Sequence, residues 1–206
     1  MVWHPEAVTV ETQATLRVLR DRGLFQGAYL AGGTGLALHM GHRLSEDLDI
    51  FVSELFDEET MLQRVQDAPA FSLVAKAPHT LHANIRGTKV SFLGYQYPLL
   101  FSVTLFDGVP VADIRDIACM KISAIASRGT KRDFIDLYLG AHQFGLDKLL
   151  GLFQRKYAQT GYNRIHVFKS LLFFDDAEKD PMPHMLVPLD WDAVKLFFRR
   201  TVPELL

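Results

Sequence analysis

Two aspartates spaced by one residue, Asp47 and Asp49, stand at the start of an apolar run that reads DLDIFV. Residues two apart on a strand share a face and lie about 6.7 Å apart along it. Two carboxylates at that spacing can converge on one or two Mg²⁺ ions, because Mg²⁺ takes one or two protein carboxylates together with waters and phosphate oxygens. The alternative is a pair of exposed acids at a strand start, paired with Arg43 or Lys89.

A glycine pair, Gly32 and Gly33, ends the preceding apolar run, and Thr34 follows directly. Glycines let a backbone turn sharply and approach a ligand closely, and the free N–H groups at a helix start attract phosphate oxygens. We expect Thr34 to cap the helix over 34–41 or to donate its hydroxyl to a phosphate. The alternative is a tight strand-to-helix turn that binds nothing.

Together, a phosphate-binding turn, one short helix and a metal-binding strand make a compact unit. Phosphoryl and nucleotidyl transfer need this arrangement, because their catalysis is mostly positioning and charge neutralisation. Arg43 and Ser45 lie in the loop before the aspartates. Arg43 is expected to neutralise donor phosphates or to pair with Asp47, and Ser45 to bond a phosphate or to cap the loop.

The elements that must position these residues change character along the chain. In the first part, periodicity predicts helices over 6–22, 34–41 and 57–68. Strands or β-rich runs are predicted over 27–32, 47–52, 71–77, 80–87, 89–95 and 103–112. Turn signals predict a hairpin turn over 85–90. The later part reads as helices over 113–129, 130–145, 146–161, 162–174 and 191–200, with a proline-broken loop over 175–184. This order predicts an α+β protein with one domain over 1–112 and a C-terminal helical domain over 113–206.

The composition is that of an ordinary globular protein. The 206 residues are 49% hydrophobic and 22% charged, with a formal net charge of −2, so there is no strong overall field for nucleic acid or membranes. The segment MVWHPEAV lacks a basic region followed by an apolar run, so it is not expected to be a secretory signal. No apolar run approaches the roughly 20 residues of a membrane span. The single cysteine, Cys119, excludes an intrachain disulfide. We therefore expect a cytoplasmic protein with no membrane partner.

A second group of charged residues lies in the helical part. Lys121 has apolar neighbours, and Asp133 and Asp136 share a face of the next predicted helix. Burying acids costs several kcal/mol unless they are paired, so they are expected to bond Lys121 or Arg128. The alternatives are a surface-packed Lys121 stem with its ammonium in water and an exposed Arg132–Asp136 ion pair.

Two blocks of the sequence carry a resemblance to a known family. GGTGLALHMGHRLSEDLDIF resembles the signature of the nucleotidyltransferase-fold superfamily, which is Gly-Gly or Gly-Ser, a helix and then Asp-x-Asp. The GHRLSEDLDIF form is more closely similar to the AbiEii/AbiGii toxin family, as are the lysine-bearing and Arg-Asp-x-x-Asp helices in RDIACMKISAIASRGTKRDFIDLYL. The resemblance implies a nucleotidyltransferase (DNA polymerase beta-like) fold, with a mixed β-sheet and a C-terminal helical domain.

The resemblance also implies an activity and the residues for it. Asp47 and Asp49 would hold Mg²⁺ or Mn²⁺, Lys121 would contact phosphate, and Asp136, with Asp133 as a second candidate, would position the acceptor or act as a base. The nucleoside triphosphate (NTP) donor would be bound by Gly32, Gly33, Thr34, Arg43 and Ser45. The predicted function is metal-dependent transfer of a nucleoside monophosphate (NMP) to a tRNA or protein acceptor, by a toxin that has a cognate antitoxin.

One position departs from the superfamily pattern. Active members usually carry a third carboxylate on a later strand, where KVSFLGY has Ser91, and serine is a poor Mg²⁺ ligand and a poor base. The alternative function is therefore a catalytically weak nucleotide-binding protein that acts through a partner. A third possibility is a metabolic or antibiotic-modifying transferase. The other polar residues of this strand pair are His79, His82 and Asn84, and both histidines are expected at surface strand positions.

Cations are spread over the C-terminal half of the sequence. They are expected either to bind an RNA backbone or to form a solvated face. These residues are Arg155, Lys156, Arg164, Lys169, Arg199 and Arg200.

Overall fold

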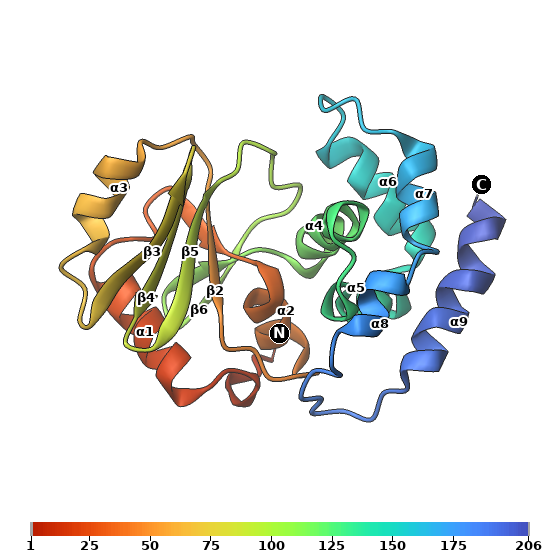
Figure 1. The fold of residues 1–206 in the computed structure, drawn as a ribbon, viewed down its shortest axis with the longest axis horizontal. Helices are drawn as coiled ribbons and strands as arrows, with labels where there is room; N and C mark the ends of the chain where they lie inside the picture. The colour runs from red at the N-terminus through yellow and green to blue at the C-terminus, as the bar shows by residue number, and fades with distance from the viewer. Residues whose placement is uncertain (1, 206) are drawn as a thin grey trace. The chain divides into compact units, whose positions relative to one another are not determined.

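A computed structural model describes residues 2–205 of the chain (Figure 1). The chain divides into two compact units. The first unit runs to Pro98 and includes Ser102–Asp113, and the second comprises Leu99–Phe101 and the residues from Ile114 onward. No helix within residues 2–205 is both long and apolar enough to cross a bilayer.

The first unit is a mixed sheet with helices. Its elements are η1 (Pro5–Ala7), α1 (Val10–Asp21), β1 (Ala28–Leu30), α2 (Gly32–Met40), β2 (Leu48–Val52), α3 (Glu58–Val65), β3 (Phe71–Ala77), β4 (Thr80–Ile85), β5 (Thr88–Gly94), β6 (Thr104–Phe106) and β7 (Val109–Val111). The strand order is β3-β4-β5-β2-β1-β7-β6. β2 runs parallel to β5 and β1 parallel to β7, whereas the other neighbours are antiparallel.

The core of this unit lies on one face of the sheet. Leu48 and Ile50 of β2 are fully buried there, and α1 and α3 contribute Leu16 and Met61 to the same apolar cluster. Because side chains alternate along a strand, Asp49 points to the opposite face. The hydrophobic pattern of β2 therefore decides on which side of the sheet the candidate site lies.

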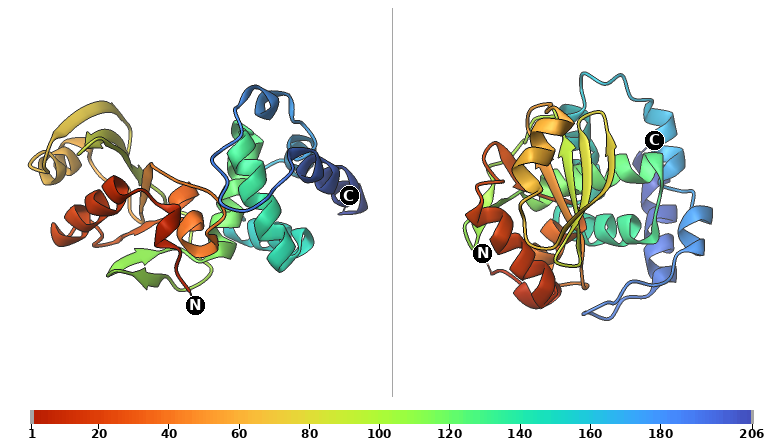
Figure 2. Two further views of the ribbon diagram at one scale, coloured as in Figure 1. Left: turned by 90° about the horizontal axis from the view of Figure 1, so that it is seen from below. Right: turned by 60° about the vertical axis from the view of Figure 1, so that its left-hand side comes forward.

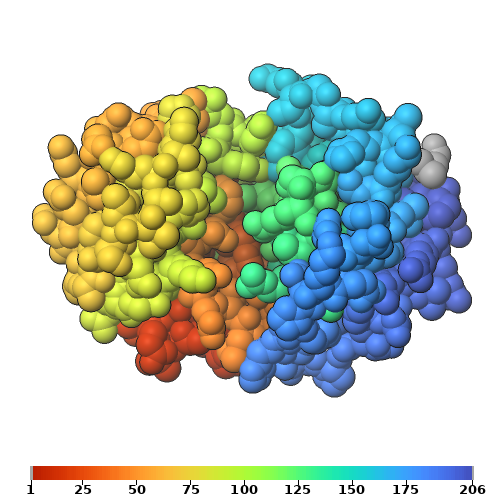
Figure 3. Space-filling model, viewed as in Figure 1, coloured from red at the N-terminus to blue at the C-terminus, as the bar shows by residue number. Residues whose placement is uncertain are grey.

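Both edges of the sheet are hairpins. At one edge β3 and β4 pair, and at the other the short strands β6 and β7 pair, so the predicted run 103–112 is two strands (Figure 2). β3 lies at the surface (yellow, Figure 3). Its Val74 is 64% exposed. The predicted turn over 85–90 is confirmed, because Arg86 and Gly87 both have positive φ angles, as a tight two-residue hairpin turn requires.

The second unit is helical. Its elements are α4 (Ile114–Ser127), α5 (Lys131–Phe144), α6 (Leu146–Lys156), α7 (Arg164–Ser170), α8 (Asp175–Lys179), α9 (Trp191–Thr201) and η2 (Val202–Leu205). α4 packs against α5, α6 and α7, and α5 packs against α8 and α9. Asp116, in the first turn of α4, accepts backbone N–H bonds from Leu100 and Phe101 and so fastens that segment to the helices.

Several predicted helices have different bounds in the structure, and one helix was not predicted. The helix predicted from residue 6 begins at Val10, because Pro5–Ala7 form a short 3₁₀ turn and the Thr9 side chain caps α1 by accepting the Thr12 N–H. The predicted loop over 175–184 contains α8, whose acidic first turn suits a helix N-terminus. The mixed sheet followed by helices confirms the predicted α+β class.

Candidate active site

The glycine turn and the second aspartate lie against each other. Gly32 is the first residue of α2 and has a φ of 61°, in the left-handed region that favours glycine. A Cβ added at Gly32 would lie 2.5 Å from Asp49 Oδ2. The missing side chain therefore leaves the space in which the Asp49 carboxylate approaches the start of α2.

The second glycine makes room for the loop that precedes β2. A Cβ added at Gly33 would lie 2.5 Å from a guanidinium nitrogen of Arg43 and 3.4 Å from Ser45 Oγ. Arg43 is buried, and its Nη1 donates to the Leu44 carbonyl at 3.1 Å. The predicted donor-binding residues Arg43 and Ser45 are thus brought to the glycine turn.

Thr34 is not the helix cap that the sequence predicted. α2 begins two residues earlier, with Ala31 at the N-cap and no side-chain cap bond. The buried Thr34 hydroxyl donates to the Asp47 carbonyl oxygen, and it therefore accepts from the Ser45 hydroxyl at 2.8 Å. Thr34 fastens the loop before β2 to α2 and so fixes where Asp47 lies.

Asp47 and Asp49 stay the predicted ligands of a divalent metal. Asp47 lies one residue before β2, Asp49 lies within it, and both are partly exposed. Among residues 2–205, no three His, Cys, Asp or Glu side chains are grouped so that they could hold a metal ion. Mg²⁺ fits a two-carboxylate site, since waters and substrate phosphates complete its shell.

The position that departs from the superfamily pattern has a partner that the sequence did not reveal. Ser91 of β5 lies beside Asp49 of β2 in the parallel register and opposite His82 of β4 in the antiparallel one. His82 Nδ1 and Ser91 Oγ are hydrogen-bonded at 3.0 Å. The alternation of Leu81, His82 and Ala83 predicts the face of His82, but only the strand register reveals its partner.

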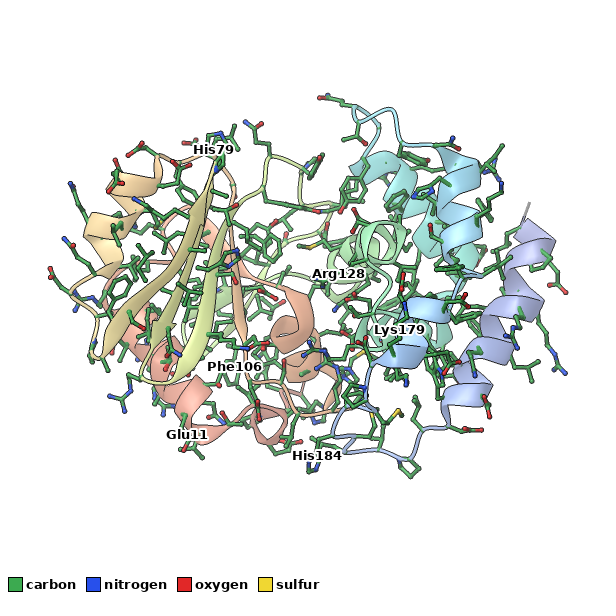
Figure 4. The ribbon with its side chains drawn as sticks, viewed as in Figure 1. Glu11, His79, Phe106, Arg128, Lys179 and His184 are labelled. Carbon is green, nitrogen blue, oxygen red and sulfur yellow. The ribbon has the colours of Figure 1, made fainter. Side chains whose placement is uncertain are left out.

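His79 is not at a strand position. It lies in the turn between β3 and β4, at one end of the strands (Figure 4), and has a φ of 55°. Its backbone N–H donates to the Glu58 carboxylate, and its Nδ1 is hydrogen-bonded to the Phe56 carbonyl at 2.9 Å. These bonds give His79 a structural role in holding the turn.

Lys121 and the two aspartates of α5 form a buried charge cluster inside the second unit. Lys121 Nζ lies 2.9 Å from Asp133 Oδ1 and 2.7 Å from Asp136 Oδ2. Its side chain is 7% exposed, so the surface-packed alternative is wrong. The expectation that the acids bond Lys121 or Arg128 is confirmed, and the predicted roles of Lys121 and Asp136 in phosphate and acceptor binding stay predictions.

The cluster controls the ionisation of Asp133. Burial by itself raises the pKa of the Asp133 carboxyl, but the Lys121 ammonium, the Arg128 guanidinium and the Thr130 hydroxyl outweigh it and lower that pKa to about 2. Arg128 Nε donates to Asp133 at 3.0 Å and the Thr130 hydroxyl at 2.7 Å. Asp133 is therefore a carboxylate at neutral pH.

Two other polar residues of the second unit are structural. Lys156, one of the cations expected either to bind RNA or to form a solvated face, is instead fully buried and pairs with Asp116 at 2.8 Å. Burial raises the pKa of the Cys119 thiol to about 12, so this thiol is not a nucleophile at neutral pH.

Comparisons with known proteins show which family the chain is similar to. A family model described as the nucleotidyl transferase AbiEii toxin of a Type IV toxin–antitoxin system matches residues 15–101 and 92–204. An uncharacterized protein of Aquifex aeolicus is 34% identical over 202 residues, which are 95% of this chain and 96% of that protein.

Two solved structures share the fold. MenT4, a nucleotidyltransferase toxin of Mycobacterium tuberculosis, aligns with a TM-score of 0.53 and 16% identity over 95% of this chain and 86% of its own. ANT(2″)-Ia in complex with adenylyl-2″-tobramycin aligns with a TM-score of 0.56 and 12% identity over 74% of this chain and 100% of its own. The predicted nucleotidyltransferase fold is thereby confirmed. With the family model matching nearly all of the described residues, the chain belongs to the AbiEii nucleotidyl transferase toxin family.

Proposed function

We propose that this protein transfers an NMP from an NTP to a hydroxyl group of an acceptor, with Mg²⁺ or Mn²⁺ bound by Asp47 and Asp49. The observation that carries the proposal is the close approach of the Asp49 carboxylate to Gly32, the first residue of α2. A metal-binding carboxylate beside a helix start places the metal and the phosphate oxygens of one ligand next to each other.

The chain's own groups supply the phosphate site. The N–H groups in the first turn of a helix lack intrahelical partners, so those of Gly32, Gly33 and Thr34 can bond phosphate oxygens. Arg43, packed under Gly33, adds a positive charge near this turn. When bound, the divalent metal neutralises negative charge on the triphosphate and on the transition state.

The transfer step is a displacement at phosphorus. The acceptor hydroxyl oxygen forms a bond to the α-phosphorus of the NTP, and the bond from that phosphorus to the bridging oxygen breaks. Pyrophosphate leaves, and the hydroxyl proton passes to a base. The residues of the first unit contribute by holding the triphosphate in line for this attack.

We propose tRNA as the first acceptor to test and a protein as the second, with a cognate antitoxin as the partner. The acceptor proposal rests on the family resemblance. The partner proposal rests on membership in a family described as part of a toxin–antitoxin system. A small neighbouring gene whose product binds this chain and blocks label transfer would support the toxin–antitoxin pairing.

The experiment that tests the proposed function compares wild type with Asp49→Asn. Labelled NTPs are titrated with and without Mg²⁺ and then incubated with purified tRNA and with protein extract. We expect Mg²⁺-dependent binding and label transfer by wild type, and a loss of transfer of at least about 10²-fold in Asp49→Asn, because the metal contributes several kcal/mol. Asp176→Asn is the control, since Asp176 forms an exposed pair with Lys179.

The same experiment distinguishes the proposed function from the alternative function. Ser91 beside Asp49, where a third carboxylate was expected, favours a protein that binds nucleotide without transferring it. Mg²⁺-dependent NTP binding with no label in either pool would support that alternative. Metal-independent binding that is unchanged in Asp49→Asn would contradict the proposed metal site at Asp47 and Asp49.

A further inference from the structure

Three polar side chains form a row across three neighbouring strands of the first unit. Asp49 of β2 is the register partner of Ser91 of β5, and Ser91 is the register partner of His82 of β4. Register partners in adjacent strands project from the same face of a sheet. Asp49, Ser91 and His82 therefore share the face opposite the apolar core.

The hydrogen bond between His82 and Ser91 fixes the imidazole. His82 Nδ1 lies 3.0 Å from Ser91 Oγ. When Nδ1–H donates to the serine oxygen, the lone pair of the ring is on Nε2, because the neutral imidazole carries one proton. In that tautomer Nε2 can accept a proton, and the hydrogen bond to Ser91 holds the plane of the ring.

The spacing of the row suits a proton transfer at the ligand. Neighbouring strands lie about 4.8 Å apart, so the backbones at Asp49 and His82 are separated by about 10 Å. An attacking oxygen lies roughly 3–3.5 Å from phosphorus and about 3 Å from its base. The reacting atoms of a ligand held at Asp49 therefore fit in the space between Asp49 and His82.

The other polar groups nearby are poorer proton acceptors. Asn84, two residues along β4, has an amide that does not take up protons, and Lys89 of β5 carries an ammonium. Asp47 and Asp49 are assigned to the metal. Histidine is the side chain whose ordinary titration range lies near neutral pH, which suits a general base.

We propose that His82 is the general base of the transfer reaction and that Ser91 is its positioning residue. This inference rests on the proposed function. His82 Nε2 takes the proton of the acceptor hydroxyl as the oxygen bonds to the α-phosphorus and pyrophosphate leaves, and the imidazolium then releases that proton to water. The Ser91–His82 pair thus supplies the proton acceptor that the sequence at position 91 lacks.

The test is a comparison of transfer rates in four proteins: wild type, His82→Gln, Ser91→Asp, and the double variant. We expect His82→Gln to lower kcat by about 10²–10⁴-fold, with Mg²⁺–NTP affinity and the melting temperature nearly unchanged. In the Ser91→Asp background, His82→Gln should cost less than tenfold, because the new carboxylate accepts the proton. A purely structural His82 would not give this rescue.

His79→Gln is the matched control, because His79 is a histidine of the same unit that bonds the Phe56 backbone instead of Ser91. It should leave kcat within a few-fold of wild type. A kcat for His82→Gln equal to that of an active wild type would overturn the base assignment and leave the proposed function standing. Weakened NTP binding with unchanged kcat would also overturn it. No transfer by wild type or by Ser91→Asp would overturn the proposed function and the base together.

Discussion

Backbone conformation and the position of the Asp49 carboxylate both favour glycine at position 32. Its φ of 61° is costly for a residue with a Cβ, and the space that a Cβ would fill holds the Asp49 carboxylate. Gly27 has a similar φ of 68°, but nothing lies within 4 Å of an added Cβ there. The two glycines therefore separate the cost of backbone strain from the cost of displacing Asp49.

Gly32→Ala should weaken Mg²⁺–NTP binding by at least tenfold, whereas Gly27→Ala should leave it unchanged. Gly27→Ala should lose about 1–2 kcal/mol of unfolding free energy, because it places a Cβ at positive φ. Gly32→Ala should lose at least as much, because its Cβ also displaces the Asp49 carboxylate. Titration with NTP and Mg²⁺, together with urea unfolding of each variant, measures the two effects. Equal nucleotide affinities in the two alanine variants would show that the contact with Asp49 does not matter for binding.

Single residues differ in how far the sequence predicts them. The sequence alone singles out Asp47, Asp49 and the glycine pair as candidates, because their types and spacing are local. The bonds of Thr34 were not predicted, because its partners belong to the loop before β2. The His82–Ser91 bond depends on the register of two strands, which neither strand's own sequence determines.

At the scale of elements, α4 and α5 are joined by charge as well as by apolar packing. Lys121 of α4 is bonded by Asp133 and Asp136, which lie one turn apart on the face of α5 that meets it. A buried pair of this kind adds little net stability over apolar packing, but removing one partner leaves an uncompensated charge. The cluster therefore specifies how these two helices pack.

Lys121→Met should destabilise the protein by about 3–5 kcal/mol, because it leaves two buried carboxylates without their shared ammonium. Lys179→Met is the matched control, since Lys179 pairs with Asp176 while 74% exposed and should cost less than about 1 kcal/mol. Chemical unfolding of both variants measures the difference. A loss for Lys121→Met no larger than that for Lys179→Met would contradict the structural role of the cluster.

Most helices and strands were predictable because their hydrophobic periodicity is local. The errors occurred where tertiary contacts determine whether a segment is helical. The pattern over 6–22 contains apolar residues that are buried but not helical, such as Val8, which forms a bridge with Ser45. α8 was missed because the prolines that follow it made the whole segment read as a loop. Its buried Ala177 contributes to packing that the sequence alone does not show.

At the scale of the whole molecule, the net charge near zero includes several buried ion pairs. Lys121 and Lys156 are buried in the second unit, each with at least one aspartate. A group whose pKa differs between the folded and unfolded chain makes stability depend on pH. The stability of the chain at low pH should therefore depend on the buried Asp133, whose pKa is lowered, rather than on the total charge.

The lowered pKa of Asp133 determines in which direction, and over which pH range, the stability of the protein changes. Its pKa is about 2 in the folded protein, below the value of about 3.9 for an unfolded aspartate. As the pH falls, the unfolded chain thus binds this proton before the folded chain does. The stability that ionised Asp133 contributes is therefore complete above about pH 4, and about 2 kcal/mol of it is lost as the pH falls toward 2. Urea unfolding of wild type and Asp133→Asn between pH 6 and pH 2.5 measures it. The unfolding free energies of the two proteins should converge as the pH falls, because only wild type loses this contribution, and a constant difference would contradict the assignment.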